Sequence, residues 1–215
     1  MNEWLIYIII AVLSYLLGSI PFAYLIVKYA TGGDLRKMGT GNIGAMNSYD
    51  ETKKRWIGIT IFILDFVKGI VAVLISRQLL NTFPAIGLSA VFAVAGHNFS
   101  VYLKFKGGRG LATSAGVMML INPAFVLIWC LLYIMSYKII LKNIHVSCVV
   151  ASILAPFTVY YLPAGLIAKT STANVTGITE LMLYISAICI LILLKHIEPI
   201  RDLINSNNNS KENNG

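Results

Sequence analysis

The sequence predicts an all-α polytopic membrane protein, and three observations support this fold class. Of its 215 residues, 57% are hydrophobic and only 12% are charged, whereas soluble domains carry about twice that share of charge. The mean hydropathy is +0.76, and apolar runs recur at lengths that suffice to cross a bilayer as helices. The cations behind the net charge of +8 lie mostly in short clusters between these runs, which is typical of a membrane protein and argues against nucleic acid as a partner.

Six apolar runs define the expected helices, and each is long enough for a span at about 1.5 Å per residue. The first lacks the basic start and the cleavage site of a signal peptide, so we expect it to be retained. The fourth is interrupted at Pro123, which removes a backbone donor, so we expect a hairpin of two helices, 111–121 and 123–137. The runs cover residues 4–29, 56–76, 83–103, 111–137, 144–162 and 178–194.

With this hairpin the chain has about seven membrane helices in one domain, residues 1–204. The polar tail, residues 205–215, is expected to be disordered. The positive-inside rule places the N-terminus outside the cell membrane and the C-terminus in the cytoplasm. This orientation rests on 14 of the 17 lysines and arginines, which lie in the segments 28–55, 104–109, 138–142 and 195–211.

A polar, glycine-rich stretch follows the first run and reads DLRKMGTGNIGAMN, from Asp34 to Asn47. Glycine permits positive φ and a close approach of the backbone to a ligand, and successive exposed amides form an anion-binding nest. A flexible basic loop would account for the pattern as well. The residues expected to bind substrate here are Gly39, Thr40, Gly41, Asn42, Gly44 and Asn47.

A second motif, KFKGGRG, lies directly before the helix expected from Leu111. A glycine turn that leads into a helix presents free N–H groups and the positive end of the helix dipole, and neighbouring cations make such a place suited to phosphate. A turn that only carries the charge of a cytoplasmic loop is the alternative. The candidate residues are Lys104, Lys106, Gly107, Gly108, Arg109 and Gly110.

Ionisable residues also lie within or beside the apolar runs. Asp65 and Lys68 have i, i+3 spacing and can pair on one helix face, in either a structural or a functional role. For His97, about six residues from its helix end, we favour a structural role. The stretch LLKHIEPIRDL places His196 at the end of the last run, as a site residue or as part of a charged exit from the membrane. The three cysteines lie in apolar runs and are expected to be packing residues.

These motifs, together with LLGSIPFAYLI and Val146–Ser147, have the order and spacing of a known family. Over roughly residues 10–204 the chain resembles the bacterial acyl-phosphate-dependent glycerol-3-phosphate acyltransferases, the PlsY family. The resemblance implies a seven-helix bundle with its motifs on the cytoplasmic side. It also implies that an acyl phosphate acylates the 1-hydroxyl of glycerol 3-phosphate, giving lysophosphatidic acid and phosphate.

The resemblance further implies which residues act. Thr40, Arg109 and His196 are then the expected catalytic residues, and Ser147 joins the substrate-binding set. No cofactor and no metal are expected, since no metal cluster or nucleotide motif is apparent. The partners implied are the two substrates and the lipid bilayer, and the oligomeric state is left open.

The chain departs from the family pattern at four positions. Thr40 replaces a serine and keeps the hydroxyl, and Arg109 replaces a lysine and keeps the charge. Asp50 stands where the family has arginine, and Pro199 where it has asparagine, so two substrate contacts are lost. These losses leave open a regulatory protein descended from the enzyme. A transporter of a phosphorylated solute is the other alternative, against which the one-sided polar motifs and the lack of a repeat argue.

Overall fold

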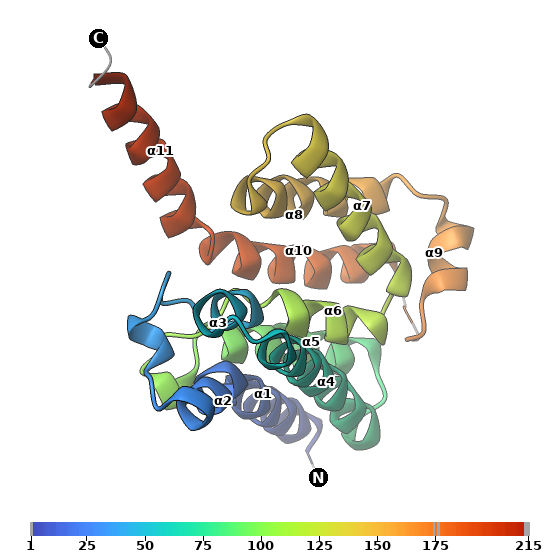
Figure 1. The fold of residues 1–215 in the computed structure, drawn as a ribbon. Helices are drawn as coiled ribbons and strands as arrows, with labels where there is room; N and C mark the ends of the chain where they lie inside the picture. Colours follow the sequence, from blue (N-terminus) through green and yellow to red (C-terminus); the bar gives the residue numbers. More distant parts are fainter. Residues whose placement is uncertain (1, 174, 176, 213–215) are drawn as a thin grey trace.

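The computed structural model describes residues 2–173, 175 and 177–212, and these residues form helices and no strand (Figure 1). The all-α class is therefore confirmed for the described part of the chain. The α-helices are α1 (Glu3–Ser19), α2 (Phe22–Thr31), α3 (Ala45–Thr52), α4 (Arg55–Leu79), α5 (Phe83–Asn98), α6 (Leu111–Met119), α7 (Pro123–Ile139), α8 (Ile144–Tyr160), α9 (Ala164–Thr170), α10 (Ile178–Leu194) and α11 (Ile197–Glu212).

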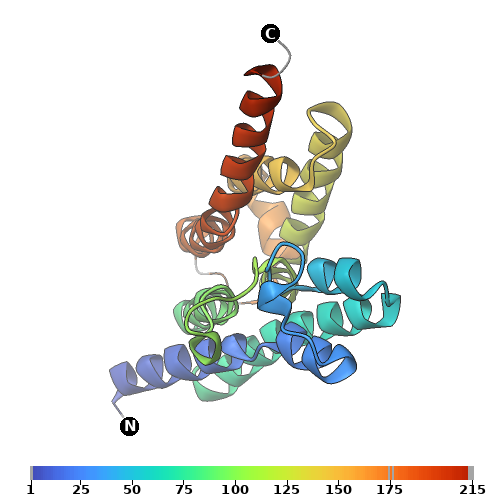
Figure 2. The same cartoon turned by 60° about the vertical axis from the view of Figure 1, so that its left-hand side comes forward.

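The helices form two groups that meet along α5 and α10. Helices α1, α4 and α6 pack against α5, and α2 packs on α4, whereas α7 and α8 form a hairpin that packs on α10 (Figure 1). Contacts between α5 and α10, and between α6 and α7, join the two groups. The C-terminal helix α11 projects away from the bundle, as the turned view also shows (Figure 2).

The outside of the bundle is apolar, as a lipid-facing surface must be. Large side chains more than half exposed occur on several helices, among them Ile8, Leu127, Phe157, Leu183 and Ile190. By length and composition, three stretches of the described chain suffice to cross a bilayer: Glu3–Thr31, Arg55–Leu79 and Phe83–Leu103. The bent pair of α10 and α11 gives a fourth if it counts as one span. The expected total of seven spans stays a prediction.

The expected break at Pro123 is confirmed. Helix α6 ends at Met119, and α7 begins at Pro123 after a cap in which the Asn122 side chain accepts a hydrogen bond from the N–H of Phe125 at 3.1 Å. The nine residues of α6 amount to only about 14 Å of helix, roughly half the thickness of a bilayer core. One end of this short helix therefore lies inside the bundle.

Glycines bring α6 into backbone contact with α4. A Cβ at Gly116 would collide with the carbonyl of Phe66, and one at Gly69 would lie 2.5 Å from the carbonyl oxygen of Thr113. Small residues at such contacts let membrane helices approach closely. The position of α6, and with it the direction of its N-terminus, is thus fixed by α4.

Two boundaries differ from the expectation. The first run forms two helices rather than one, because Pro21 lacks the N–H that would continue the α1 ladder, and α2 begins at Phe22. The helix α11 extends to Glu212, past the expected start of the tail at residue 205, and the disorder of the tail stays a prediction. Residues 213–215 lie outside the described residues.

Candidate active site

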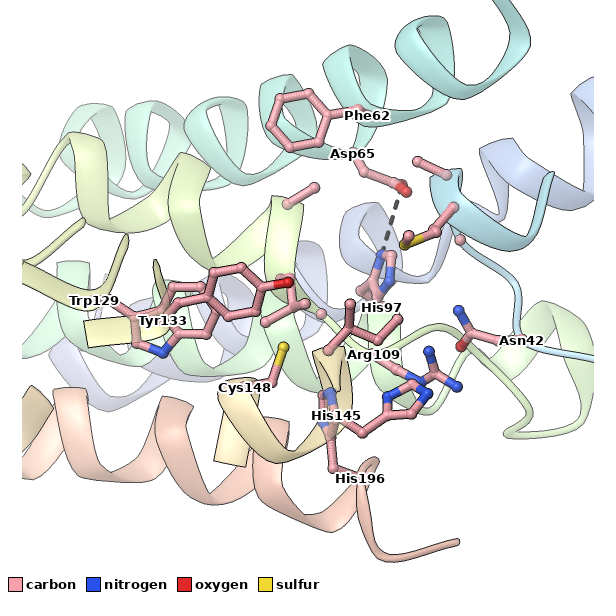
Figure 3. Close-up of a pocket in the computed structure, with 17 residues that line it drawn as sticks. Asn42, Phe62, Asp65, His97, Arg109, Trp129, Tyr133, His145, Cys148 and His196 are labelled. Atoms are coloured by element: carbon pink, nitrogen blue, oxygen red, sulfur yellow. Dashed lines mark ion pairs between the residues drawn. The ribbon is translucent and has the colours of Figure 1, made fainter. Parts of the chain in front are cut away.

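A cavity of about 260 Å³ lies among α4, α6, α7, α8 and the loop before α3 (Figure 3). Figure 3 shows Asn42, Arg109 and His145 together at one side, and the stacked rings of Trp129 and Tyr133 at the other. The cavity therefore has a polar part and an apolar part. Of the expected site residues, Asn42, Gly44, Arg109, Gly110 and His196 line it.

The N-terminus of α6 opens into the polar part of this cavity. Gly110 is the N-cap, with a φ of 81° and no side chain to cap the helix. The first hydrogen bond of the helix runs from the N–H of Ser114 to the carbonyl oxygen of Gly110, at 2.8 Å. The N–H groups of Leu111 and Ala112, which line the cavity, have no acceptor among the described residues. The positive end of the helix dipole is thus available to an anion.

Arg109 adds a full positive charge beside these amides. Its side chain is partly buried and makes no ion pair or hydrogen bond to any residue that the structure describes. Burial lowers the pKa of the guanidinium, but the ordinary value is so high that the group stays charged at neutral pH. Partial burial of a cation without a protein partner is costly, so this one is suited to an anionic ligand.

His196 is held in one orientation by its own helix. Its Nδ1 lies 2.8 Å from the carbonyl oxygen of Ile192. A carbonyl can only accept, so Nδ1 carries the hydrogen of the neutral ring and Nε2 keeps a lone pair. His196 is 1% exposed and lines the cavity. Its Nε2 is therefore placed to accept a proton from a bound hydroxyl group.

The glycine turn before α6 is used differently from the expectation. The N–H of Gly107 donates to the carbonyl of Asn98 at 3.2 Å, and the N–H of Gly108 donates to that of His97 at 3.1 Å. These amides cap α5, so they are not free to form an anion nest, and substrate binding by Gly107 and Gly108 stays a prediction. The free amides lie a few residues later, in the first turn of α6. Lys104 and Lys106 are exposed and do not line the cavity.

Gly108 is required by packing. Its φ lies outside the left-handed region, but an added Cβ would collide with Nε2 of His97 and lie 2.5 Å from the carbonyl oxygen of Ile43. The backbone at this point therefore approaches a buried ring, and no ligand contact is needed to explain the glycine.

In the first motif, Asn47 organises the loop. Its Oδ1 accepts the N–H of Thr40 at 3.1 Å, and its Nδ2 donates to the carbonyls of Met38 and Asn42 at 3.1 and 3.0 Å. Gly39 and Gly41 have positive φ, as the sequence led us to expect. Asn47 is buried and fully bonded within the protein, so its amide shapes the loop.

Within the same loop, Thr40 and Asn42 face different surroundings. The Thr40 side chain is exposed, and its hydroxyl accepts the N–H of Asn42 at 3.4 Å. Thr40 does not line the cavity, whereas Asn42 does, and the Asn42 side chain has no partner among the described residues.

Asp34 binds Arg36 at 2.6 Å, and this hydrogen bond lowers the pKa of Asp34 to about 2. The positive charge of Arg36 is therefore balanced by Asp34 within the loop.

At the wall of the cavity, Asp65 joins a buried cluster. Lys68 donates to Asp65 at 2.8 Å and to the carbonyl of Ile20 at 2.9 Å, at the break between α1 and α2. His97 Nδ1 lies 3.6 Å from Asp65 and 3.2 Å from the hydroxyl of Thr113. The pair expected from the spacing of Asp65 and Lys68 is confirmed. Every member contacts another helix, so the cluster ties α2, α4, α5 and α6 together around the site.

Helix α8 contributes two cavity residues that the motifs did not indicate. The hydroxyl of Ser147 donates to the carbonyl of Asn143 at 2.9 Å, and its side chain is buried away from the cavity. His145 and Cys148, on the same helix, line the cavity instead. The i, i+3 spacing of His145 and Cys148 places them on one face of α8, and the i, i+4 spacing of Trp129 and Tyr133 does the same on α7. These spacings can be read from the sequence.

Asp50 and Pro199, the two departures that remove a family contact, both lie outside the cavity lining. Asp50 is exposed on α3, and Pro199 is in the first turn of α11. Among the residues that the structure describes, no group of three His, Cys, Asp or Glu could hold a metal ion.

Comparisons with known proteins identify one family. The model of the family described as "Glycerol-3-phosphate acyltransferase" matches residues 8–206. A glycerol-3-phosphate acyltransferase of Ehrlichia canis is 36% identical over 205 residues, covering 95% of this chain and 98% of its relative. One from a Wolbachia of Culex pipiens is 35% identical over 204 residues, covering 91% and 94%.

Solved structures give the same result. The crystal structure of PlsY, an integral membrane glycerol 3-phosphate acyltransferase, in its glycerol 3-phosphate form has a TM-score of 0.75 and 27% identity, covering 93% of this chain and 92% of its own. Its lysophosphatidic acid form gives 0.73 and 25% over the same shares. With its apolar helices, this chain is a multi-pass integral membrane protein. On these matches, the chain belongs to the glycerol-3-phosphate acyltransferase family.

Proposed function

We propose that this protein transfers a fatty acyl group from an acyl phosphate to the 1-hydroxyl of glycerol 3-phosphate, releasing lysophosphatidic acid and phosphate. One observation carries the proposal beyond family membership: the open N-terminus of α6, with the unpartnered Arg109, meets His196 Nε2 in one cavity. Both substrates carry phosphate, so both need such an anion site. The matched relatives are named for the acceptor substrate.

The bond changes can be assigned to this chain's own groups. The amides of α6 and Arg109 hold phosphate and the charge that develops on the acyl carbonyl oxygen. His196 Nε2 accepts the proton of the 1-hydroxyl as its oxygen bonds to the acyl carbon. The bond from that carbon to the phosphate oxygen breaks, and the departing phosphate takes the proton. Atoms and charges balance without any covalent enzyme intermediate.

An apolar groove offers a place for the acyl chain. A second hollow of about 270 Å³ lies beside the cavity and shares Phe62, Leu111 and Trp129 with it. Its remaining lining is nearly all apolar and comes from α4, α6, α7 and α10. A chain that enters this groove from the lipid would place its activated head at the N-terminus of α6. Burial of each methylene stabilises the complex by about 0.8 kcal/mol.

We also propose that the protein lies in the cytoplasmic membrane with seven spans and its N-terminus outside. Arg77, at the far end of α4, donates to the carbonyls of Leu120 and Thr172. The end of α4, the end of α6 and the segment after α9 therefore meet at one face, which supports placing 77–83 and 163–179 outside together. Cysteine labelling from outside tests this: reaction at position 138 would contradict it.

The direct test is turnover by the purified protein. Acyl phosphate and glycerol 3-phosphate should give lysophosphatidic acid and phosphate in equal amounts, and His196→Ala should lower kcat with little change in folding. Acyl-coenzyme A serves as the alternative donor. Turnover with that donor alone would overturn the acyl-phosphate assignment, and no turnover with either, by folded protein, would favour the regulatory descendant.

A further inference from the structure

His145 is a polar residue of the cavity to which neither the sequence motifs nor the proposed mechanism assigns a role. It lies in the first turn of α8 and lines the cavity with Arg109 and His196. Its ring packs edge-on against that of His196, with 5.7 Å between ring centroids and 61° between planes. The contact fixes one side of the imidazole and leaves the rest directed to the cavity, beside Arg109 and Asn42 (Figure 3).

The ring nitrogens of His145 are free to bind a ligand. Neither makes a hydrogen bond to any residue within the described ranges. The start of α8 does not need the ring either, since Asn143 Oδ1 accepts the N–H groups of His145 and Val146 at 2.8 and 3.2 Å. This helix start is closed by its own cap, in contrast to that of α6. What α8 offers the cavity is a side chain.

The surroundings of this ring favour an anion. The polar part of the cavity contains the amides of α6, Arg109 and the Asn42 side chain, all able to donate. The carboxylate in the described lining is Asp65, which already binds Lys68. A neutral imidazole always presents one N–H donor. A phosphate bound at Arg109 would therefore find a further donor in His145.

The position of His145 along α8 indicates which phosphate it meets. Cys148, one turn further along the helix, lines the same cavity, and Trp129 and Tyr133 continue the wall toward the apolar groove. His145 thus lies where the apolar wall ends and the polar part begins. An acyl chain in the groove would bring its own phosphate to this point.

We propose that His145 donates a hydrogen bond to the phosphate of the acyl-phosphate donor, together with Arg109, and keeps this contact as inorganic phosphate forms. The inference rests on the proposed function. His145 transfers no proton in this role. It orients the leaving phosphate, while His196 accepts the proton of the 1-hydroxyl. It is a binding residue for the donor substrate.

Steady-state kinetics of three variants test the assignment. His145→Phe keeps a ring against His196 but removes both nitrogens, and it should raise KM for acyl phosphate by about tenfold to a hundredfold, the usual effect of one hydrogen bond to a charged group. KM for glycerol 3-phosphate should change much less. His145→Gln restores a donor and should recover most of the loss. Lys142→Gln, which removes a nearby exposed charge outside the cavity lining, is the matched control and should behave as wild type.

The opposite pattern would overturn the proposal. A rise in KM for glycerol 3-phosphate alone would assign His145 to the acceptor, and unchanged constants in His145→Phe would remove it from binding altogether. Should His145→Phe fail to fold, His145→Leu takes its place in the same comparison.

A binding measurement separates this proposal from the proposed function. Inorganic phosphate should raise the melting temperature of the wild type and of Lys142→Gln, by mass action on the folded state, and should raise that of His145→Phe less. If the wild type shows no turnover, the proposed function fails, but this comparison still decides the role of His145. Equal shifts in wild type and His145→Phe, or no shift in the wild type, would overturn the phosphate contact.

Discussion

An arginine lies at each end of helix α6, Arg77 from α4 at one end and Arg109 at the other, and their surroundings differ. At the C-terminal end, Arg77 donates to the carbonyls of Leu120 and Thr172, and the Thr172 hydroxyl also donates to Leu120 at 2.6 Å. At the N-terminal end, Arg109 and the first amides have no partner among the described residues. The negative end of the helix is satisfied by the protein, whereas the positive end is left for a ligand. Both ends obey the same electrostatics.

Removing Arg109 should have the largest effect and should act on catalysis. Arg109→Ala is expected to lower kcat/KM by about a hundredfold to a thousandfold, as does loss of one donor to a developing charge. Arg109→Lys keeps the charge and should retain most of the activity, because lysine is the residue that the family pattern has there. Initial rates check this, with melting temperatures as the control. A loss of folding without a loss of specific activity would show that the two ends are alike.

Removing Arg77 should act on stability instead. Arg77→Ala leaves two carbonyls without their donor and is expected to lower the free energy of unfolding by about 1–3 kcal/mol. The protein that remains folded should keep its kcat. Thermal unfolding in detergent, followed by assays of the folded fraction, measures both quantities. If kcat falls while stability holds, the assignment of this end to structure is wrong.

Gly108→Ala tests whether the glycine turn belongs to the structural or to the ligand-binding part. The added methyl would collide with His97 and the carbonyl of Ile43, so stability should fall by about 1–3 kcal/mol, as is usual for overpacking. KM for acyl phosphate should change little in the protein that folds. Gly165→Ala is the control, since no atom lies within 4 Å of its added Cβ. A raised KM with unchanged stability would restore the nest at Gly108.

The smallest effect is expected at Asp50. This residue is exposed on α3 and does not line the cavity, so water and salt screen its charge from a bound phosphate. Asp50→Arg should therefore change KM for glycerol 3-phosphate by no more than about twofold to threefold, within the range of a screened surface charge. Rates at low and high salt measure this. A large, salt-independent fall in KM would mean that the first motif moves into the site when substrate binds.

Particular residues show how much of the fold could be predicted from the sequence. The break at Pro123 was predictable because proline acts locally, and the pairing of Asp65 with Lys68 because i, i+3 neighbours lie on one face. The same local rule applies at Pro21, where a long apolar run suggests one continuous helix. The polar helix α3 lacks the apolar pattern that marks a helix, so the sequence does not predict it.

The site itself was only partly predictable, because a motif shows which groups are present and not which are already bonded. The backbone N–H groups of Gly107 and Gly108 donate to carbonyls at the end of α5, and the side-chain amide of Asn47 is hydrogen-bonded within its own loop. Those partners are set by tertiary packing. Arg109, Asn42 and His196, expected from the sequence as site residues, line the cavity, while their roles stay predictions. His145 belongs to no motif, and its place beside His196 depends on the packing of α8 on α10.

The buried pair on α4 also bears on how the chain enters the membrane during synthesis. A lone lysine at the centre of a helix costs about 2.5–3.5 kcal/mol on insertion scales. Lys68 carries its counter-charge one turn away on the same helix, so α4 can leave the translocon already neutral, before α5 and α6 have been made. The carbonyl of Ile20, exposed by the break at Pro21, then receives Lys68 when the helices assemble. Asp65→Asn should accordingly lower the inserted fraction of an isolated α4 segment in a glycosylation-mapping assay, and equal insertion would show that the pair matters only after assembly.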